Sequence, residues 1–266
     1  MGWNSWNVFH CDISEDKVKA AADKIVEVGL DKLGYNYVNL DDCWQAPERQ
    51  DGHVVADPTK FPNGMKAVGD YIHDKGLKFG IYSCAGTKTC AGFPGSLDHE
   101  YVDAMDYASW GVDYLKYDNC YNEAGARSSK DRYTAMSKAL VSTGRPIFYS
   151  ICNWGNENIA EWGNTIANMW RTTQDIEIYP TKHNQWQSLK ANFIKNQMKP
   201  ESASPGHWND PDMLQVGNGL LTLDEEKTHF ALWAFAKAPL IIGCDLTKIS
   251  EESLAVLKNE NLIKIN

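Results

Sequence analysis

The sequence predicts an α/β fold that consists of one parallel β-barrel surrounded by helices. Two observations support this prediction. Short apolar runs alternate with longer amphipathic stretches along the whole chain, and there are about eight of each. Alternation of this kind is typical of parallel strands joined by helical crossovers. Eight such units favour a closed (β/α)8 barrel, the TIM-barrel architecture. A doubly wound open sheet is the alternative, although no GxGxxG motif follows the first strand, which weakens a dinucleotide-binding version.

The expected strands are the short apolar runs. Several hold only three to six residues, which is typical of strands buried on both faces. We expect strands over residues 1–6, 35–40, 78–83, 114–117, 147–150, 168–171, 207–209 and 240–243.

The expected helices lie between these runs. Ser14 can cap a helix that runs through Val28 and stops at Gly29. Ser128 and Thr222 each begin a sequence that resembles a capping box. We expect helices over residues 14–28, 64–75, 101–110, 128–143, 185–196, 222–238 and 250–259, with a short and weak fifth crossover around 158–162.

The length of 266 residues fits one large domain or two small ones. Single barrels of about 250 residues are common. No low-complexity segment, charge block or proline-rich linker divides the chain. We therefore expect a single barrel domain over residues 1–266.

Composition narrows the range of partners. Lys and Arg total 26 against 35 Asp and Glu, so the formal net charge is −9, which disfavours a nucleic-acid partner. No apolar run reaches 18 residues, so we expect no membrane span. The chain begins Met1-Gly-Trp and shows no signal peptide. An oligomer is compatible with the sequence.

Carboxylates and tryptophans recur where the expected strands end. In a barrel these ends meet around one mouth, where active sites lie. The residues concerned are Trp6, Asp41, Asp42, Asp118, Trp154, Asp175, Asp210 and Asp212. A structural interpretation exists for each: an Asp after a strand often caps the next helix, Asp210 before a proline is typical of a turn, and a Trp is more often core than sugar platform.

The expected strand ending at Asp118 contains a second informative residue, Lys116. Residues two apart in a strand point to the same face, so Lys116 shares its side with Asp118. A Lys that faces into a barrel mouth is costly unless it forms an ion pair or serves a function. Two carboxylates facing each other across a pocket favour glycoside hydrolysis, in which one attacks the anomeric carbon and the other transfers protons.

Two other classes of function compete with this interpretation. A carbohydrate-binding barrel without catalysis would be favoured by the loss of Asp118 or Asp175, and both are present. A metal-dependent hydrolase would use the Asp cluster, but such barrels usually add His ligands at strand ends. The seven His form no spaced cluster. We therefore expect no metal and no organic cofactor.

Several motifs together closely resemble the retaining α-galactosidases of glycoside hydrolase family 27. They span nearly the whole chain in the order of that family, which makes the set specific. The matching stretches are Met1-Gly-Trp-Asn-Ser-Trp6, Leu40-Asp-Asp-Cys-Trp44, Lys88-Thr-Cys-Ala-Gly-Phe-Pro-Gly95, Leu115-Lys-Tyr-Asp-Asn-Cys120, Trp170-Arg171 with Asp175, Trp208-Asn-Asp-Pro-Asp-Met213 and Ala238-Pro-Leu240.

The resemblance implies catalytic roles for two carboxylates. Asp118 matches the nucleophile and Asp175 the acid/base of a double displacement through a glycosyl-Asp118 intermediate. We expect Lys116 to keep Asp118 ionised, and Asp175 to have a raised pKa before it donates its proton. The resemblance further implies substrate contacts from Trp6, Asp41, Asp42, Tyr82, Cys90, Lys116, Cys152, Asn153, Trp154, Arg171, Asp212 and Met213.

The implied sugar contacts favour a terminal α-D-galactosyl residue. Asp41 and Asp42 match the pair that holds the 4- and 6-hydroxyls, Lys116 reaches the 3- and 4-hydroxyls, and Arg171 lies on the 2- and 3-hydroxyl side. Glucose, with its 4-hydroxyl equatorial, would leave these groups unpaired. The natural substrate can be a raffinose-type oligosaccharide, a galactomannan side chain or a glycolipid.

Two activities of the same family are the nearest alternatives. An α-N-acetylgalactosaminidase needs small residues near the 2-hydroxyl, where this chain has the bulky Trp154. A β-L-arabinopyranosidase tends to have a longer acid near C6, where this chain has Asp41. Asn153 departs from the Glu of many relatives, so its contacts stay open.

The seven cysteines contain no CxxC pair, and their spacing alone assigns no disulfide. The resemblance implies the pairs Cys11–Cys43 and Cys90–Cys120, hence a secreted or extracellular protein, with Cys84, Cys152 and Cys244 free. Family relatives usually continue into a C-terminal β-sandwich. Because the chain stops at Asn266, we expect either a trimmed catalytic domain or a minimal family member without that sandwich.

Overall fold

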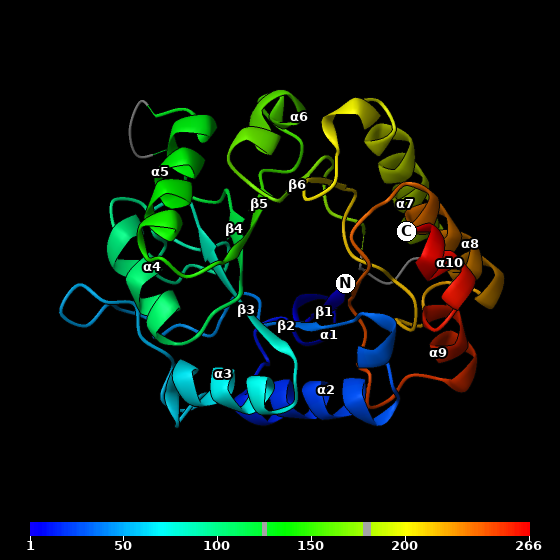
Figure 1. Ribbon diagram of the computed structural model, residues 1–266, viewed down its shortest axis with the longest axis horizontal. Helices are drawn as coiled ribbons and strands as arrows, with labels where there is room; N and C mark the ends of the chain where they lie inside the picture. The colour runs from blue at the N-terminus through cyan, green and yellow to red at the C-terminus, as the bar shows by residue number, and fades with distance from the viewer. Residues whose placement is uncertain (124–126, 178–181) are drawn as a thin grey trace.

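The protein forms a barrel of eight parallel strands inside a ring of helices, as the alternation of apolar runs predicted. The computed structural model describes residues 1–123, 127–177 and 182–266 (Figure 1). The strand order in the sheet is β7-β6-β5-β4-β3-β2-β1-β8. Between β7 and β8 the circle is bridged by an isolated parallel pair, Leu214 with Ile242. The strands are short, as expected where both faces of a sheet are covered.

All eight strands occur where short apolar runs predicted them. Their bounds are β1 Gly2–Asn4, β2 Tyr37–Asn39, β3 Lys78–Cys84, β4 Tyr114–Asp118, β5 Phe148–Cys152, β6 Met169–Arg171, β7 Trp208–Asp210 and β8 Ile241–Ile242. Strands β4 and β5 run one and two residues further than predicted, so Asp118 and Cys152 are strand residues. Strand β1 ends earlier, because the chain turns into a helix at Trp6.

The longer helices form the outer layer, whereas the short α1 lies inside the ring beside β1 (Figure 1). The helices of the described residues are α1 Trp6–Phe9, α2 Glu15–Glu27, α3 Gly64–Asp74, α4 Glu100–Ser109, α5 Ser129–Ser142, α6 Ile159–Trp162, α7 Lys182–Asn196, α8 Leu223–Phe235, α9 Glu251–Leu257 and α10 Glu260–Ile265. Short 3-10 turns cover Asp31–Leu33, Gly163–Thr165 and Pro200–Ser202.

The predicted helix starts are confirmed by their caps. The Ser14 hydroxyl accepts a hydrogen bond from the Lys17 backbone N–H, and both Ser128 and Thr222 form complete capping boxes. The sequence missed α1 and the last helix, α10, while the helix predicted over residues 250–259 corresponds to α9. Helix α10 begins after Asn259, whose side chain caps it by accepting from the Leu262 backbone N–H.

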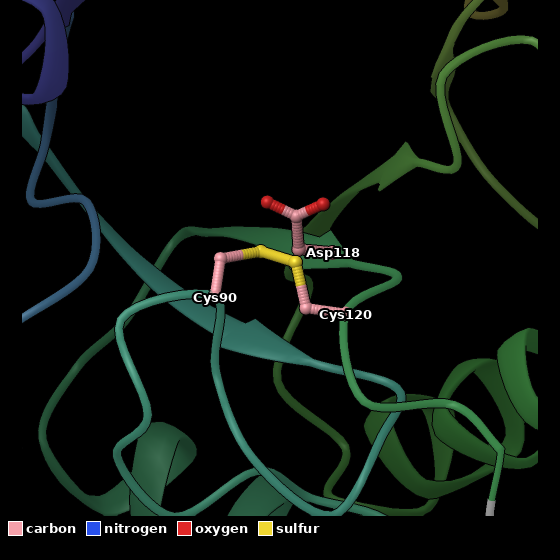
Figure 2. A group of neighbouring side chains, drawn as sticks. All are labelled: Cys90, Asp118 and Cys120. Atoms are coloured by element: carbon pink, nitrogen blue, oxygen red, sulfur yellow. A yellow bond between two sulfur atoms is a disulfide. The ribbon is translucent and has the colours of Figure 1, made fainter.

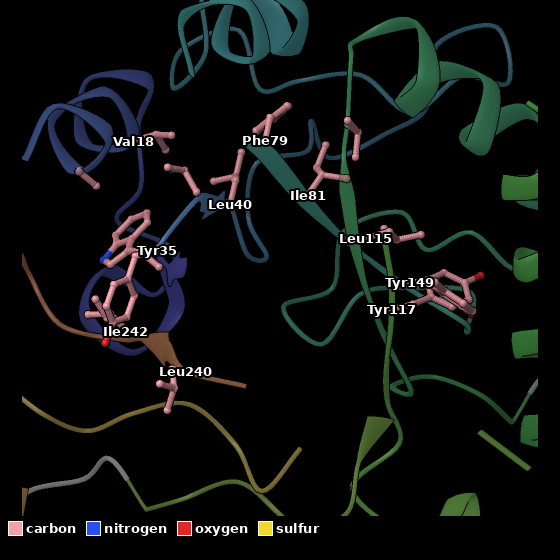
Figure 3. Packing of buried hydrophobic residues seen from close by; sticks show 14 of the residues in the cluster. Val18, Tyr35, Leu40, Phe79, Ile81, Leu115, Tyr117, Tyr149, Leu240 and Ile242 are labelled. Carbon is pink, nitrogen blue, oxygen red and sulfur yellow. The ribbon is translucent and has the colours of Figure 1, made fainter. Parts of the chain in front are cut away.

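The hydrophobic core fills the space between the barrel and the helices. Side chains such as Val18 of α2, Phe79 of β3 and Leu115 of β4 are fully buried there (Figure 3). Much of the aromatic content belongs to this core, since Trp3 and Trp170 are also fully buried. The large number of tryptophans is therefore mostly a packing feature.

The parallel register brings polar residues together at the carboxyl ends of the strands. Tyr82 of β3 pairs with Lys116 of β4, and Asp118 of β4 pairs with Cys152 of β5. Across the described residues, no helix has the length and apolarity required to cross a membrane.

Candidate active site

A cavity of about 350 Å³ opens at the carboxyl ends of the strands. Residues from six strands or the segments that follow them line it, together with α1. The lining residues that the sequence pointed to are Trp6, Asp41, Asp42, Tyr82, Cys90, Lys116, Asp118, Cys152, Trp154, Arg171, Asp175, Asp212 and Met213. This position agrees with the location of active sites in barrels of this kind.

Asn153 is the expected substrate contact that the structure does not bring to this cavity. Its neighbours Cys152 and Trp154 line the wall, whereas Asn153 is fully buried, and its side-chain Nδ2 donates to the carbonyl of Asn156. Strand β5 ends at Cys152, and Asn153 lies in the bend that follows it. The structure therefore gives no support to a substrate contact at Asn153, which stays a prediction.

Four lining residues were missed as cavity residues: Asn7, Cys120, Ile176 and Glu177. Asn7 was missed because helix α1 was not predicted. Cys120 carried a usable signal, since it lies two residues after Asp118. Ile176 and Glu177 follow Asp175 directly, but no periodic pattern marks residues of an irregular loop.

A buried ion pair lies on the side of the cavity formed by β2 and β4. The Lys116 Nζ donates to the Asp41 Oδ2 at 2.8 Å, and the Asn4 Nδ2 donates to the same oxygen at 2.7 Å. Burial opposes the charge of Lys116, but Asp41 and Asp118 raise its pKa well above the ordinary value. The prediction that Lys116 and Asp118 share one face is confirmed. A cation and two carboxylates therefore lie close together at this wall.

Asp42 completes this wall and is held by the backbone. Its Oδ1 accepts from the Cys43 N–H at 2.7 Å, and its Oδ2 accepts from the Ala91 N–H at 2.9 Å. Burial raises the pKa of Asp42, while these hydrogen bonds oppose the rise. The carboxylate thus has a fixed orientation.

Asp118 is buried at the end of β4, with both oxygens hydrogen-bonded. The Tyr82 hydroxyl donates to its Oδ2 at 3.0 Å, and the Asn119 N–H donates to its Oδ1 at 2.9 Å. Burial raises the pKa of Asp118 to about 6, and the nearby Lys116 only partly offsets this rise. Lys116 thus favours the ionised form of Asp118, as predicted, but desolvation has the larger effect on this pKa.

Asp175 lies at the mouth of the cavity, with its side chain 70% exposed. The Arg171 Nη1 donates to its Oδ1 at 2.9 Å. Desolvation opposes its charge, but Arg171 and Lys116 hold the pKa of Asp175 below its ordinary value. The expectation of a raised pKa is thus wrong for the protein without a bound sugar, in which Asp175 has an arginine partner.

The expected disulfides Cys11–Cys43 and Cys90–Cys120 are both present. The second lies against the Asp118 carboxylate (Figure 2). One ligand atom each from Cys90, Asp118 and Cys120 falls within 4.8 Å of the others, but the two sulfurs are bonded to each other and offer no thiolate to a metal. This disulfide therefore acts as a rigid apolar wall beside the carboxylate.

All seven cysteines lie in the described part of the chain, and the remaining three, Cys84, Cys152 and Cys244, are buried free thiols. Burial raises the pKa of each. They are therefore neutral thiols. Cys152 contributes its sulfur to the cavity wall beside Arg171.

The geometry can support a two-carboxylate reaction. One carboxylate, Asp118, is buried and fixed, and the other, Asp175, is at the mouth, where a leaving group would depart. The Lys116–Asp41 pair and Asp42 present fixed donors and acceptors to the hydroxyls of a polar substrate. Trp6 and Trp154 add aromatic surface to the same cavity.

Comparison with known proteins gives a consistent result. A family profile described as Alpha galactosidase A matches residues 1–266. Alpha-galactosidase 2 of Arabidopsis thaliana is 50% identical over 268 residues, and an alpha-galactosidase of Oryza sativa subsp. japonica is 51% identical over 268 residues. These alignments cover 100% of this chain, but 66% and 62% of the two relatives. The chain thus spans somewhat less than two thirds of their length.

Solved structures agree in fold. An alpha-galactosidase from Saccharomyces cerevisiae matches with a TM-score of 0.93 at 43% identity, covering 100% of this chain and 63% of that one. A β-L-arabinopyranosidase from Geobacillus stearothermophilus matches with a TM-score of 0.87 at 26% identity, covering 100% of this chain and 75% of that one.

Proposed function

We propose, since this chain belongs to the alpha galactosidase A family, that it hydrolyses terminal α-D-galactosyl residues with retention of anomeric configuration. One observation carries this proposal: Asp118 and Asp175 line a single cavity, one buried and fixed and the other at its mouth. The relatives that match the whole chain at about half identity are named alpha-galactosidases, which supports the same activity.

The proposed reaction has two displacement steps. In the first, an Asp118 oxygen attacks the anomeric carbon, the bond to the leaving oxygen breaks, and Asp175 transfers its proton to that oxygen. The product is a β-linked galactosyl ester of Asp118. In the second, Asp175 removes a proton from water, the water oxygen attacks the anomeric carbon, and the Asp118 carboxylate is released.

The side chains around Asp118 are suited to hold it for attack. Tyr82 and the Asn119 N–H fix both of its oxygens. The Cys90–Cys120 disulfide limits its movement on a third side (Figure 2). A nucleophile fixed in this way loses little orientational freedom when the sugar binds.

Selectivity for galactose follows from the Lys116–Asp41 pair and Asp42. These charged groups are oriented by Asn4 and by backbone N–H groups, so they cannot turn away from the sugar. They match the axial 4-hydroxyl and the 6-hydroxyl of galactose. An epimer with an equatorial 4-hydroxyl would leave desolvated charges without partners, which is strongly disfavoured.

The alternatives within the family are less well supported. Trp154 and Cys152 occupy the wall where a 2-acetamido group would need room. β-L-Arabinopyranose lacks the 6-hydroxyl that Asp41 and Asp42 are suited to bind. We therefore favour a plain galactoside over N-acetylgalactosaminides and arabinopyranosides. A structure of the Saccharomyces cerevisiae alpha-galactosidase is described with raffinose, which supports an oligosaccharide as the first substrate to test.

Substrate binding must change the protonation state of Asp175. Arg171 holds Asp175 ionised in the free protein, whereas the first step needs Asp175 protonated. A sugar whose 2- and 3-hydroxyls accept from Arg171 would weaken this ion pair, and the sugar would also displace water from Asp175. Both changes raise the pKa of Asp175.

The two disulfides support a location outside the reducing cytosol. We propose that the protein is secreted or extracellular, and that the barrel over residues 1–266 is its catalytic unit. Its expected partner is the galactoside itself. The surface carries a net negative charge, which fits neither nucleic acid nor an anionic membrane.

The proposed function is tested by following hydrolysis of p-nitrophenyl α-galactoside and raffinose. NMR during the first minutes should show α-galactose as the first anomer released. The matching α-glucoside should be cleaved at least about 10⁴-fold less efficiently. Release of β-galactose first would contradict the retaining mechanism, and preference for the glucoside would contradict the proposed sugar. Activity that is lost in EDTA would instead favour a metal-dependent hydrolase.

A further inference from the structure

The segment after β7 holds a residue in a backbone conformation that is unusual for its type. Asp212 has φ +91°, in the left-handed region that residues with a side chain rarely adopt. Such backbone costs about 1–3 kcal/mol and persists only where surrounding contacts hold it.

Two contacts hold the Asp212 backbone in place. The carboxylate Oδ1 of Asp210 accepts from the Asp212 N–H at 2.8 Å, and the Trp233 Nε1 donates to the Asp212 carbonyl at 2.7 Å. Asp210 is the last residue of β7 and is 7% exposed. A rigid strand thus sets the conformation of a residue that lines the cavity.

This conformation directs the Asp212 carboxylate at the loop that carries Asp175. The Ile176 N–H donates to the Asp212 Oδ2 at 2.8 Å, and the Met213 N–H donates to its Oδ1 at 2.8 Å. Ile176 is the residue next to Asp175. The backbone of the acid/base loop is therefore fixed one residue away from the side chain that transfers protons.

Other contacts join the same two segments. The Asn192 Nδ2 of α7 donates to the carbonyls of Gln174 and Pro211, at 2.8 and 3.2 Å. The Thr172 N–H donates to the Asp210 carbonyl at 2.9 Å. The loop over residues 172–176 is thus attached to residues 210–212 at several points along its length.

We propose that Asp210 is a positioning residue for the acid/base Asp175, acting through Asp212 and the Ile176 N–H. The proposal rests on the proposed function. Without the Asp210 acceptor, the Asp212 N–H loses its partner and the left-handed backbone loses its support. The Asp212 carboxylate then leaves the Ile176 N–H, and Asp175 loses its alignment. Asp210 itself stays outside the set of residues that touch the sugar.

The test uses substrates that differ in how much they need a proton from Asp175. A sugar leaving group, as in raffinose, needs a proton from Asp175. The leaving group of 2,4-dinitrophenyl α-galactoside is dinitrophenolate, which leaves without one. Asp210→Ala should lower kcat for raffinose by about 10²-fold, since a misplacement of about 1 Å costs this much. It should change release of dinitrophenolate in the first turnover by less than about fivefold. Asp210→Asn keeps an acceptor oxygen, so it should recover most of the raffinose activity.

Asp245→Ala is the matched control. The Asp245 Oδ1 also accepts from the N–H two residues ahead, that of Thr247, at 3.0 Å in the segment after β8. Its loss should affect both substrates alike. Equal losses on the two substrates in Asp210→Ala would overturn the proposal, because they would show that the whole site, and not the proton transfer from Asp175, had changed.

A second measurement does not depend on the reaction. Hydrogen exchange of the Ile176 amide should be faster in Asp210→Ala than in the wild type, and close to wild type in Asp210→Asn and Asp245→Ala. Unchanged protection of Ile176 in Asp210→Ala would refute the coupling. A wild type that cleaves no α-galactoside would refute the proposed function instead, and the exchange result would still decide whether Asp210 controls this loop.

Discussion

Arg171 and Asp175 form an ion pair at the cavity mouth, with 2.9 Å between the Arg171 Nη1 and the Asp175 Oδ1. The same nitrogen lies 3.4 Å from the Asp212 Oδ1, so one guanidinium serves two carboxylates. As a consequence, the order of the two pKa values in the free protein is inverted: the nucleophile Asp118 binds a proton more tightly than the acid/base Asp175. The pKa of Asp175 is lowered, whereas burial raises that of Asp118 to about 6.

This order predicts the pH dependence of kcat/KM. The reactive form needs one proton shared by the pair, so activity requires the singly protonated state. The higher of the two pKa values belongs to Asp118, and above about pH 6 this last proton is lost. We expect kcat/KM for p-nitrophenyl α-galactoside to fall about tenfold per pH unit above this point, and its acid limb to lie below the ordinary pKa of an Asp. A value that stays constant up to pH 8 would contradict the inverted order.

Replacement of the proposed nucleophile should abolish turnover. Asp118→Asn keeps the shape of the side chain and should retain hydrogen bonding to Tyr82, but a neutral amide cannot attack the anomeric carbon. We expect kcat to fall about 10⁴-fold or more, with little loss of stability. In the wild type, a fluorinated galactosyl fluoride whose second step is slow should label one peptide, and mass spectrometry should find the sugar on Asp118. A label on Asp175 would reverse the proposed roles.

The sequence was sufficient to predict the barrel, because eight apolar runs and their helix caps are local features. It also predicted that Lys116 and Asp118 share a face, since that follows from strand geometry alone. The structure differs at Asn153: Cys152, the last residue of β5, lines the cavity, whereas Asn153 is buried in the bend that follows and does not line it. The resemblance placed both in the site, and the conformation of an irregular bend has no signature in the apolar runs.

The proton affinities could not be predicted from the sequence. The partner of Asp175 in the free protein is decided by how the loop after β6 folds back onto Arg171. The pKa of Asp118 depends on how completely the barrel mouth excludes water from it. Both are properties of the assembled site, and neither has a signature in spacing or composition.

The buried Lys116–Asp41 pair predicts a stability effect. Asp41 is 2% exposed, so a change of Lys116→Met leaves a desolvated carboxylate with Asn4 as a neutral partner. We expect the free energy of unfolding to fall by about 3 kcal/mol, measured by urea denaturation at pH 7. The double variant Lys116→Met with Asp41→Asn removes both charges and should recover part of this loss. A single variant as stable as the wild type would show that water reaches Asp41.

The two disulfides provide a controlled comparison of stability and catalysis. Their partners are 32 residues apart in Cys11–Cys43 and 30 apart in Cys90–Cys120, so the chain-entropy account predicts nearly equal stabilisation, about 3–4 kcal/mol each. The second lies against Asp118 (Figure 2) and lines the cavity, whereas Cys11 and Cys43 are not among the lining residues.

Replacing each pair by serines should therefore lower the midpoint of thermal unfolding by similar amounts, while the effects on turnover differ. Loss of Cys90–Cys120 frees the wall beside the nucleophile, and we expect kcat to fall about tenfold or more at a temperature where both variants remain folded. Loss of Cys11–Cys43 loosens the residue next to Asp42, so its effect should fall mainly on KM. Equal losses of kcat in the two variants would mean that the disulfide beside Asp118 contributes only to stability.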